Sequence, residues 1–508
     1  MEIKGKKILI FGLARSGAGA ANLLARSGAE VTATDKKSKG ELTEFVERLL
    51  PSVRLALGGH PDGIFKNTDL IVISPGVPLD ILPLKKAKDA GIKIIGELEL
   101  AYQIIQGLGF RGQGLEEKTE PIPNPQSQIP FLAVTGTNGK STTTSLIYEM
   151  IKNSGFKAIL GGNIGNALTE EIYKIQKSEE ICPRINLKNP PIPPLLKGGE
   201  GGFDFIVAEV SSFQLESIDE FRPNGATILN ITPDHLDRYH SMDEYRDAKA
   251  QVFLNQKKED FLVLNADDPE VMRLYDSRFS PQASRRGDKI QDSGLPDVYF
   301  FSRQKEVKGV YLKDGSVCSG ITDSQLIRAD EIRIKGVHNL ENAMAASAMA
   351  LLAKCPVDAI VKTLKEFPGL EHRLEFVRDL DGVDYINDSK GTNVGAVIKS
   401  LESFSGPVIL IAGGRDKAGD FSILRPLVKE RVKALVLIGE AREKINKALG
   451  DLTETRFADD FKEAVMISRR CASRGDVVLL SPACASFDMF RDFEDRGRQF
   501  KKIVGDLN

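Results

Sequence analysis

Apolar and polar positions follow two periods along the first hundred residues. Runs of apolar and β-branched residues stand at 6–12 (KKILIFG), 30–35 (EVTATD), 69–74 (DLIVIS) and 92–97 (IKIIGE), and apolar residues recur at helical spacing over 17–27. Short runs bounded by glycine or polar residues predict buried strands, and helical spacing predicts a helix. Strands alternating with helices are typical of βαβ units around a parallel sheet.

The same alternation recurs in two further blocks. One opens at 131–151 (FLAVTGTNGKSTTTSLIYEMI), and the other holds strands at 383–388, 407–414, 433–439 and 476–483. We therefore predict an α/β protein of three domains, with boundaries at 1–107, 108–369 and 370–508. Ligands of open α/β sheets bind at the carboxyl ends of the strands. Site residues are expected in the loops that follow those ends.

Two segments, 108–130 and 182–202, are rich in glycine and proline and lack either period. Such a composition cannot build a packed core. We interpret the first as a linker and the second as a surface insertion, and we expect deletion of 182–202 to preserve activity.

Composition narrows the classes of partner. The 69 lysines and arginines nearly balance the 71 aspartates and glutamates, so no global field favours nucleic acid or an acidic membrane. No apolar stretch is long enough to span a bilayer, and the five scattered cysteines form no metal-binding pair. We expect a cytoplasmic monomer that binds small molecules, with no nucleic acid and no membrane as partners.

The segment 133–144 (AVTGTNGKSTTT) carries the strongest chemical signal. An apolar strand, a glycine-rich turn and Lys140–Ser141 at the start of a helix are typical of a phosphate-binding loop, in which Lys140 reaches the phosphates and the Ser141 hydroxyl ligates Mg²⁺. The loop departs from GxxxxGK[ST], because Val134 stands where the first glycine is expected and Gly136 follows it. The alternative is a glycine-rich turn with an incidental lysine.

Three further side chains are ambiguous when read alone. Glu209 ends an apolar run (FIVAE) and is placed either to hold Mg²⁺ or to face solvent. His235 follows the run ATILNIT, where a structural histidine is the commoner outcome. Lys249 falls on a helix, where a surface lysine is the default.

The phosphate loop, GGNIG at 161–165, AEVSSFQLE at 208–216, NITPDHLDRY at 230–239 and KGVHNLENAMAA at 335–346 occur in the order found in the Mur ligases, and the chain closely resembles that family. Enzymes that glutamylate folates share part of this set. The resemblance implies a Rossmann-like N-terminal domain, a central P-loop-type mononucleotide-binding ATPase sheet and a Rossmann-like C-terminal domain. It implies an ATP-dependent ligase that joins an acid to an amino acid through an acyl phosphate. It also implies two Mg²⁺ ions, with ligands Ser141, Glu209, His235 and a carbamylated Lys249.

Roles in catalysis and ATP binding also come from this resemblance. The catalytic residues would be Lys140, Glu209, His235 and Lys249. ATP would contact Gly136, Thr137, Asn138, Gly139, Lys140, Ser141, Thr142, Asn339, Arg373 and Asp388. Asn339, like Asn163, His338 and Asn342, is also consistent with a turn or cap.

The N-terminal FGLARSG at 11–17 resembles a dinucleotide fingerprint, with an acid, Asp35, at the end of the next strand. Taken alone, this fingerprint favours NAD binding, so a nicotinamide-dependent oxidoreductase is an alternative function. That alternative would give the phosphate loop no role. The family resemblance implies instead that the fold binds the UDP of the substrate UDP-N-acetylmuramoyl-L-alanine. The contacts would be Ser16, Asp35, Lys36, Ser74, Pro75, Gly76, Asn163 and Ser211; Arg15 has no assigned role.

Two C-terminal segments distinguish members of the family. INDSKGTNVGA at 386–396 and SPACASFDMFRDFEDRG at 481–497 resemble the Mur ligases that add D-glutamate. The implied D-glutamate contacts are His372, Lys390, Thr392, Lys417, Ser486, Phe487 and Phe493. The remaining rivals are a folate polyglutamylating or cell-wall peptide recycling ligase and a non-catalytic homologue.

Overall fold

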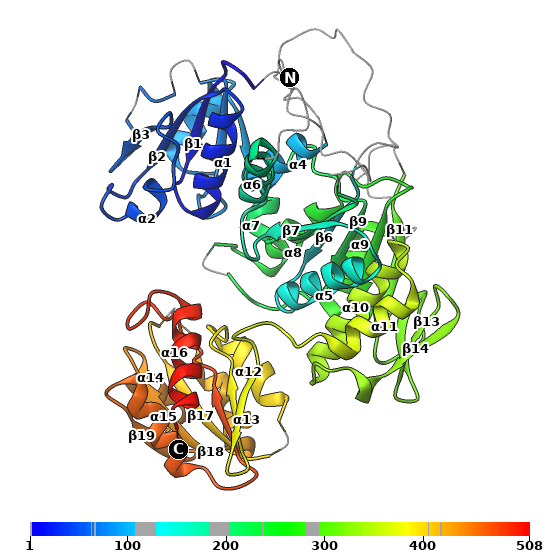
Figure 1. Cartoon of the computed structure of the whole chain (residues 1–508), viewed down its shortest axis with the longest axis vertical. Helices are drawn as coiled ribbons and strands as arrows, with labels where there is room; N and C mark the ends of the chain where they lie inside the picture. Colours follow the sequence, from blue (N-terminus) through cyan, green and yellow to red (C-terminus); the bar gives the residue numbers. More distant parts are fainter. Residues whose placement is uncertain are drawn as a thin grey trace. The chain divides into compact units, whose positions relative to one another are not determined.

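The computed structural model describes residues 3–61, 63–65, 68–106, 129–181, 203–235, 238–279, 294–404, 406–416 and 419–507. The insertions predicted around 108–130 and at 182–202 lie almost wholly outside these residues. The chain divides into two compact units, Met1–Ala329 with Glu341–Lys365, and Asp330–Leu340 with Glu366–Asn508. Three sheets are formed by the described residues (Figure 1), and the prediction of a three-domain α/β fold is confirmed.

The N-terminal sheet of the first unit has the strand order β3-β2-β1-β4-β5, and every pairing in it is parallel. The predicted strands and the helix over 17–27 are confirmed as β1, β2, β4, β5 and α1. The elements are β1 (Lys7–Phe11), α1 (Arg15–Arg26), β2 (Glu30–Asp35), α2 (Thr43–Val46), β3 (Arg54–Leu57), β4 (Leu70–Ile73), α3 (Leu82–Asp89), β5 (Lys93–Gly96) and α4 (Glu97–Ile105).

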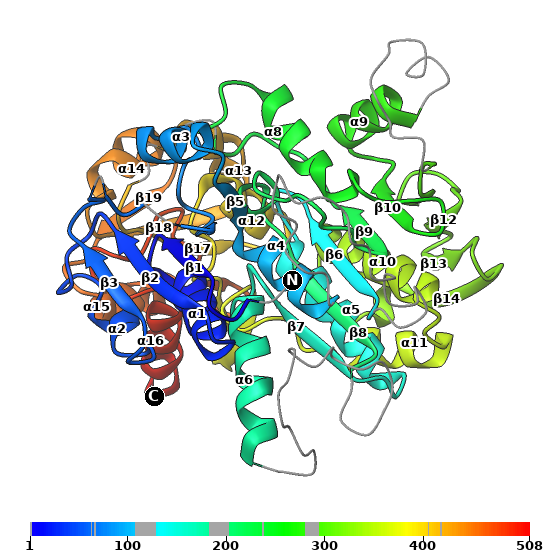
Figure 2. The ribbon, with the colours of Figure 1, turned by 90° about the horizontal axis from the view of Figure 1, so that it is seen from above.

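The central sheet has the order β14-β13-β12-β11-β10-β9-β6-β8-β7. Figure 2 shows its parallel strands β6, β8 and β7 side by side. Its elements are β6 (Phe131–Thr135), α5 (Lys140–Asn153), β7 (Ala158–Gly162), α6 (Leu168–Ile181), β8 (Phe205–Glu209), α7 (Ser212–Leu215), β9 (Gly225–Ile228), α8 (Met242–Ala250), η2 (Gln251–Phe253), β10 (Phe261–Asn265), α9 (Pro269–Phe279), β11 (Asp297–Ser302), β12 (Gly309–Lys313), β13 (Ser316–Ser319), β14 (Ser324–Arg328), η4 (Ala329–Glu331), α10 (Val337–Leu352) and α11 (Val357–Glu366).

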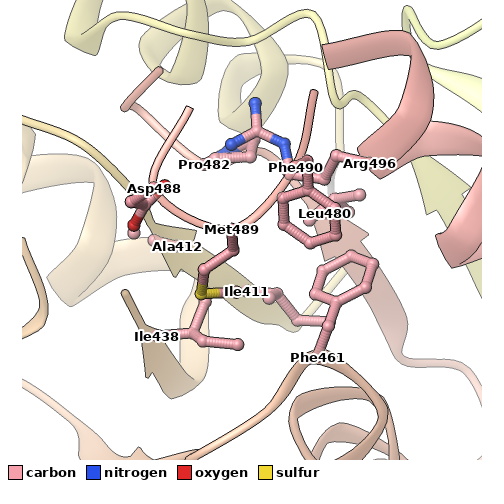
Figure 3. A pocket seen from close by; sticks show the side chains of 12 residues that line it. Ile411, Ala412, Ile438, Phe461, Leu480, Pro482, Asp488, Met489, Phe490 and Arg496 are labelled. Atoms are coloured by element: carbon pink, nitrogen blue, oxygen red, sulfur yellow. The ribbon is translucent and has the colours of Figure 1, made fainter. Parts of the chain in front are cut away.

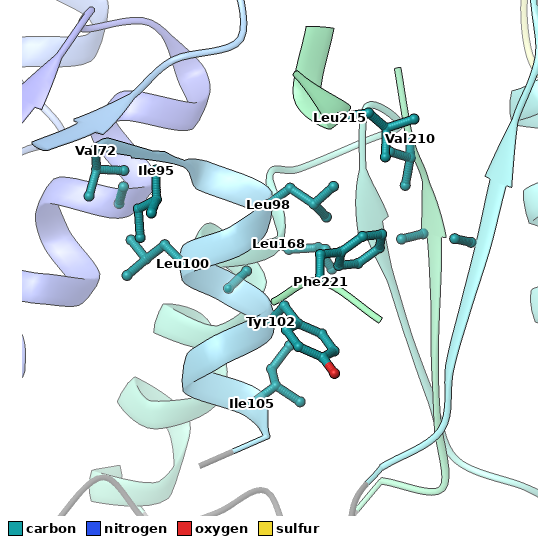
Figure 4. Close-up of a cluster of buried hydrophobic side chains, with 14 of the residues drawn as sticks. Val72, Ile95, Leu98, Leu100, Tyr102, Ile105, Leu168, Val210, Leu215 and Phe221 are labelled. Carbon is teal, nitrogen blue, oxygen red and sulfur yellow. The ribbon is translucent and has the colours of Figure 1, made fainter. Parts of the chain in front are cut away.

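Helix α4 joins the core of the N-terminal sheet to that of the central sheet. Its apolar residues contact Val72 and Ile95 on one side and Val210, Leu215 and Phe221 on the other (Figure 4). The buried Glu99 carboxylate accepts backbone N–H bonds from Asp219, Glu220 and Phe221 at 2.8, 3.0 and 2.9 Å. Continuous apolar packing and these charge-assisted bonds hold the two sheets in one unit.

The second unit is built on a six-stranded sheet of order β15-β16-β20-β17-β18-β19, parallel except for the β15–β16 pair. Apolar clusters cover both faces, as a parallel sheet requires. Its elements are β15 (Glu375–Leu380), β16 (Val383–Asn387), α12 (Val394–Glu402), β17 (Val408–Gly413), η5 (Phe421–Leu424), α13 (Arg425–Arg431), β18 (Val432–Ile438), α14 (Arg442–Leu449), β19 (Glu454–Phe457), α15 (Phe461–Cys471), β20 (Val477–Leu480) and α16 (Phe493–Gly505).

Among the described residues three antiparallel strand pairs, β12–β13, β13–β14 and β15–β16, were not separated from the parallel pattern by the sequence interpretation. Asp314 and Gly315 (φ 49° and 74°) join β12 to β13, and Asp381 and Gly382 (φ 58° and 80°) join β15 to β16. Two-residue Asp-Gly loops with positive φ at both residues favour tight hairpins. Among the described residues, no helix is both long and apolar enough to cross a membrane.

Candidate active site

The conformation of the loop between β6 and α5 is fixed by two glycines in its own backbone and by bonds to Asn230, which follows β9. Gly136 and Gly139 have φ of 149° and 85°, which disfavour any residue with a side chain. The amides of Thr137 and Asn138 donate to the carbonyl and the side-chain oxygen of Asn230, at 2.9 and 2.8 Å. Gly139, the residue before α5, makes no side-chain cap, and a helix start of this kind is suited to phosphate.

Two lysines meet at this loop. Lys140 Nζ donates to the carbonyl oxygens of Gly136 and Thr137 at 2.9 and 2.8 Å, and Lys249 Nζ donates to the same Gly136 oxygen at 2.9 Å. Lys249 is only 2% exposed, and its Nζ lies 4.3 Å from the centre of the Tyr245 ring. The surface position that is the default for a lysine does not apply to Lys249, because α8 packs it inward.

Burial of Lys249 controls its protonation. Loss of hydration, and next the positive charge of Lys140, hold the pKa of Lys249 well below its usual range, while Asp234 opposes this weakly. A neutral amine is nucleophilic and reacts with CO₂, whereas an ammonium ion does not. The site thus supplies the chemical condition for carbamylation.

Glu209 ends β8 and is 2% exposed. Its Oε1 accepts from Asn163 Nδ2 at 2.8 Å, and its backbone oxygen accepts from the Asn163 amide at 2.9 Å. Its Oε2 is buried without a hydrogen-bond partner among the described residues. A buried carboxylate oxygen left unpaired is costly, and a hard cation such as Mg²⁺ is a fitting partner for it. Ser141, also buried, is the second residue of α5 in the same unit.

His235 occupies a strained position, with φ of 55°. Its ring lies 4.7 Å from that of Phe213, and Asp234 Oδ2 lies 3.7 Å from its Nε2. No group of three or more His, Cys, Asp or Glu side chains within the described part of the chain is arranged to hold a metal. A metal ion bound at Glu209 would therefore need further ligands, such as hydroxyl, carbamate, phosphate or water oxygens.

At the N-terminal sheet the predicted residues lie at the carboxyl ends of β1, β2 and β4. Asp35 accepts from the amides of Leu13 and Lys37 at 2.7 and 2.9 Å, and buried Ser74 Oγ donates to the Gly12 oxygen at 2.7 Å. Ser16, in the first turn of α1, is half-buried, Pro75 is half-buried, and Lys36 and Gly76 are exposed. This edge gathers Ser16, Asp35, Lys36, Ser74, Pro75 and Gly76 as expected from the topology.

Arg15 and His60 make contacts that the sequence analysis did not predict. Arg15 Nη1 donates to the Gly165 oxygen at 2.7 Å, so it links the start of α1 to the loop that carries Asn163. His60 stacks on Phe11 at 4.1 Å and pairs with Thr34 Oγ1 at 3.0 Å. The sequence signal that could have indicated His60 is GGH at 58–60, directly after β3. Ser211, predicted to bind the UDP substrate, caps α7 through the Gln214 amide.

In the second unit, buried Asp388 accepts from the hydroxyls of Ser400 and Ser481, both at 2.6 Å. Burial raises the pKa of the Asp388 carboxyl, and the two hydroxyls oppose that shift. His372, 2% exposed with φ of 65°, pairs through Nδ1 with Asn387 Nδ2 at 2.9 Å, and its Nε2 is buried without a hydrogen-bond partner among the described residues. Burial lowers the pKa of His372.

Of the other residues predicted to contact D-glutamate, Lys390 and Phe493 lie together at the start of α16. Lys390 Nζ lies 5.6 Å from the centre of the Phe493 ring, and the Ser389 hydroxyl donates to the Phe493 oxygen at 2.8 Å. Thr392 is half-buried, Ser486 is buried and Phe487 is 60% exposed. Lys417 lies outside the described residues. Figure 3 shows a pocket beside this group, lined by Pro482, Asp488, Phe490 and Arg496 among others.

Helix α10 carries two asparagines and a histidine that the sequence analysis named. Asn342 Oδ1 accepts from the Thr143 hydroxyl at 3.3 Å, and a side chain at Gly139 would lie 2.2 Å from it, so Asn342 packs against the phosphate loop. Asn339 Nδ2 donates to the Lys335 oxygen at 2.8 Å. His338 has a pKa lowered to about 4, mainly by burial and next by Arg373 and Lys399. Half-buried Arg373 lies in the same unit as Asn339.

Three family models match the chain in order. They are the Mur ligase MurD-like N-terminal domain at residues 6–96, the Mur ligase middle domain at 134–350, and the Mur ligase glutamate ligase domain at 372–484.

Relatives extend the match to the whole length. The UDP-N-acetylmuramoylalanine--D-glutamate ligase of Citrifermentans bemidjiense is 43% identical over 99% of this chain and 98% of its own, and that of Geotalea daltonii is 44% identical over 99% and 98%.

Among solved structures, UDP-N-acetylmuramate-alanine ligase MurC from Thermotoga maritima is similar with a TM-score of 0.55 at 18% identity, covering 98% of this chain and 99% of its own. MurF ligase from Thermotoga maritima in complex with ADP has a TM-score of 0.55 at 14% identity, covering 99% and 98%. At such identities these two structures support the fold alone. The family models and the full-length relatives show that the chain belongs to the Mur ligase family.

Proposed function

We propose that this chain is an ATP-dependent ligase that joins D-glutamate to UDP-N-acetylmuramoyl-L-alanine in peptidoglycan precursor synthesis. The observation that carries the proposal is identity above 40% over nearly the full length of relatives named UDP-N-acetylmuramoylalanine--D-glutamate ligase. The convergence of Lys140 and Lys249 on the phosphate loop supports the ATP-dependent part.

The reaction takes place in two displacements. The terminal carboxylate of the UDP substrate attacks the γ-phosphorus of ATP; a new P–O bond forms as the bond to ADP breaks, and an acyl phosphate results. The amine of D-glutamate then attacks the acyl carbon, phosphate leaves with the former carboxylate oxygen, and the amine loses a proton. Phosphorylation is needed because a free carboxylate is a poor electrophile.

The residues of the first unit would bind and orient the anions of the first step. The α5 amides and Lys140 hold the phosphates, the Asn230 side chain fixes the loop, and Ser16, Asp35, Lys36, Ser74, Pro75, Gly76, Asn163 and Ser211 hold the UDP substrate. Ser141, Glu209, His235 and a carbamylated Lys249 would hold two Mg²⁺ ions. When bound, Mg²⁺ offsets the repulsion between the anionic nucleophile and the triphosphate.

Carbamylation is chemically balanced at Lys249. Its neutral Nζ attacks the carbon of CO₂, a C–N bond forms and one proton leaves, so the side chain changes from neutral to anionic. The resulting carboxylate would lie beside the Lys140 cation, which offsets part of the cost of burying it. Intact-mass measurement under native conditions with ¹³C-bicarbonate tests this point: a bicarbonate-dependent adduct that is absent in Lys249→Met is expected.

The residues of the second unit would bind the amino acid and part of the nucleotide. His372, Lys390, Thr392, Lys417, Ser486, Phe487 and Phe493 would hold D-glutamate, whose two carboxylates need several donors. Asn339, Arg373 and Asp388 would contact ATP. We also infer domain boundaries at 1–107, 108–369 and 370–508 and a cytoplasmic monomer that binds no nucleic acid and no membrane.

The experiment that tests the function is mass-spectrometric detection of product. The purified chain is incubated with ATP, Mg²⁺, UDP-N-acetylmuramoyl-L-alanine and D-glutamate, and a UDP product larger by one glutamyl residue is expected in a one-to-one ratio with ADP. Lys140→Ala is the control and should lower the rate by about 100-fold or more, because one preorganised positive donor to the phosphates is lost. A wild-type protein that makes ADP without the glutamyl product would overturn the proposal.

A further inference from the structure

Arg496 is a buried arginine that connects two loops of the second unit. It lies in the first turn of α16 and is 2% exposed. Its Nε and Nη2 donate to the hydroxyl and carbonyl oxygens of Ser389 at 2.9 and 2.8 Å, and its Nη1 and Nη2 reach the Cys484 oxygen at 3.3 and 3.4 Å. One rigid fork therefore holds the loop after β16 and the loop after β20 at a fixed separation.

These two loops carry residues on which the amino acid would be held. Ser389 precedes Lys390, and Cys484 stands two positions before Ser486. The Ala483 amide donates to the Gly391 oxygen at 2.8 Å, so the loops also touch directly at this point. Figure 3 shows the Arg496 side chain beside Pro482 of the second loop. A change at Arg496 would alter the spacing of both loops together.

The neighbours of the guanidinium indicate more than packing. Among the described residues its hydrogen bonds go to hydroxyl and carbonyl oxygens, which bear no net charge. Burial lowers the pKa of Arg496 to about 10, so the group stays charged at neutral pH. The carboxylates of Asp388 and Asp488 attract this charge without a hydrogen bond to it among the described residues. A buried charge is expensive compared with an apolar side chain of similar volume, so such a group is expected where the fixed geometry of its donors is useful.

We propose that Arg496 is a positioning residue for the amino-acid substrate, acting through Ser389 and Cys484 to set the separation of the Lys390 and Ser486 loops. The proposal rests on the proposed function, because that function assigns the amino acid to these loops. It adds a residue that makes no contact with the substrate itself.

The test compares variants at Arg496 with a matched control on the same helix. Arg496→Met removes fork and charge, Arg496→Lys keeps the charge without the fork, Ser389→Ala removes one acceptor, and half-exposed Arg498→Met is the control. Arg496→Met should raise the KM for D-glutamate by about tenfold or more while the KM for ATP stays within about twofold. Arg496→Lys and Ser389→Ala should fall between it and the wild type, and Arg498→Met should match the wild type.

Equal changes in both KM values, or an unchanged KM for D-glutamate in Arg496→Lys and Ser389→Ala, would overturn the inference. These two milder variants also provide the answer if Arg496→Met fails to fold. A readout without turnover separates this inference from the proposed function: hydrogen exchange should accelerate at both 389–392 and 483–487 in Arg496→Lys but not in Arg498→Met. If hydrogen exchange changes in neither loop, the positioning role is contradicted. This outcome does not depend on which amino acid the wild type adds.

Discussion

The Nζ atoms of Lys140 and Lys249 both lie 2.9 Å from the carbonyl oxygen of Gly136. Two ammonium groups on one oxygen repel each other, and the more buried of the two, Lys249, is the one whose pKa falls well below its usual range. Lys249 therefore loses its proton more readily than an ordinary lysine, which favours reaction with CO₂, and Lys140 is the lysine of the pair suited to phosphate. This difference between the two lysines is the basis of the first prediction.

Lys249→Met is expected to lower turnover by about 100-fold or more, because the proposed carbamate could no longer form at the phosphate loop. In bicarbonate-free buffer the variant should nevertheless melt at a higher temperature near neutral pH. The unfolded wild type binds more protons than the folded form between the lowered pKa and about 10.5, so wild-type stability rises with pH across that window. The advantage of the variant should shrink as the pH is raised toward 10, which thermal melting at pH 7 and 9.5 would detect.

The exposed Lys258 provides the matched control for this change. Lys258→Met should leave both turnover and the pH dependence of melting close to those of the wild type. A Lys249→Met protein that turns over normally would rule out the carbamate, whatever its melting temperature.

Asn163→Ala is expected to raise the Mg²⁺ concentration needed for half-maximal activity by about 10–100-fold, because Asn163 Nδ2 orients the Glu209 carboxylate at 2.8 Å. Asn166→Ala, in the same loop, removes a bond to Glu171 instead and should leave the Mg²⁺ requirement unchanged. A Mg²⁺ titration of phosphate release compares the two. If Asn163→Ala changes only the KM for the UDP substrate, the side chain contacts that substrate and does not serve the metal.

Gly497→Ala is expected to destabilise the second unit by about 1–3 kcal/mol through overpacking. A Cβ at Gly497 would lie 2.2 Å from His372 Nδ1, whereas one at Gly505, near the end of the same helix, meets nothing within 4 Å. Gly505→Ala should be neutral or stabilising by up to about 1 kcal/mol, as helix propensity predicts. Chemical unfolding of both variants measures the contrast, and equal stabilities would show that His372 moves aside at no cost.

The His338 side chain predicts an acid-sensitive second unit. Its pKa is about 4 in the folded protein against an ordinary value of 6.5, because of burial and next because Arg373 and Lys399 repel a proton, while Glu402 attracts one. The unfolded chain binds more protons between these values, so the free energy of unfolding falls as the pH drops from 6.5 to 4. His338→Gln should remove about 1–3 kcal/mol of that loss.

Melting curves at pH 7 and 4.5 provide the measurement for His338→Gln. The exposed His240 offers the control, and His240→Gln should lose as much stability in acid as the wild type does. If His338→Gln is as acid-sensitive as the wild type, His338 is protonated without cost in the folded protein.

The sequence predicted the order of strands and helices well, because apolar runs and helical spacing are local signals. It did not separate the antiparallel hairpins at Asp314–Gly315 and Asp381–Gly382, although an Asp-Gly pair between β runs is a usable signal for them. For the site, the motifs predicted the phosphate loop and Glu209, and their roles stay predictions.

Other features depend on contacts between distant parts of the chain. The inward position of Lys249 follows from the packing of α8 on the Gly136 loop, which is 113 residues away in sequence. The bond of Arg496 to Ser389 spans 107 residues. Neither side chain carries a local pattern that marks it as buried. For Lys249 the default for a charged residue predicted exposure, and Arg496 was not singled out.

The most direct test of the account is phosphate release from ATP by the wild-type chain with UDP-N-acetylmuramoyl-L-alanine and a panel of amines: D-glutamate, L-glutamate, D-alanine, L-lysine and none. The account predicts release with D-glutamate alone. Release with a different amine would keep the ligase and contradict the roles given to Lys390, Ser486 and Arg496. An absence of release with every amine would contradict the assignment of the N-terminal sheet to a uridine nucleotide.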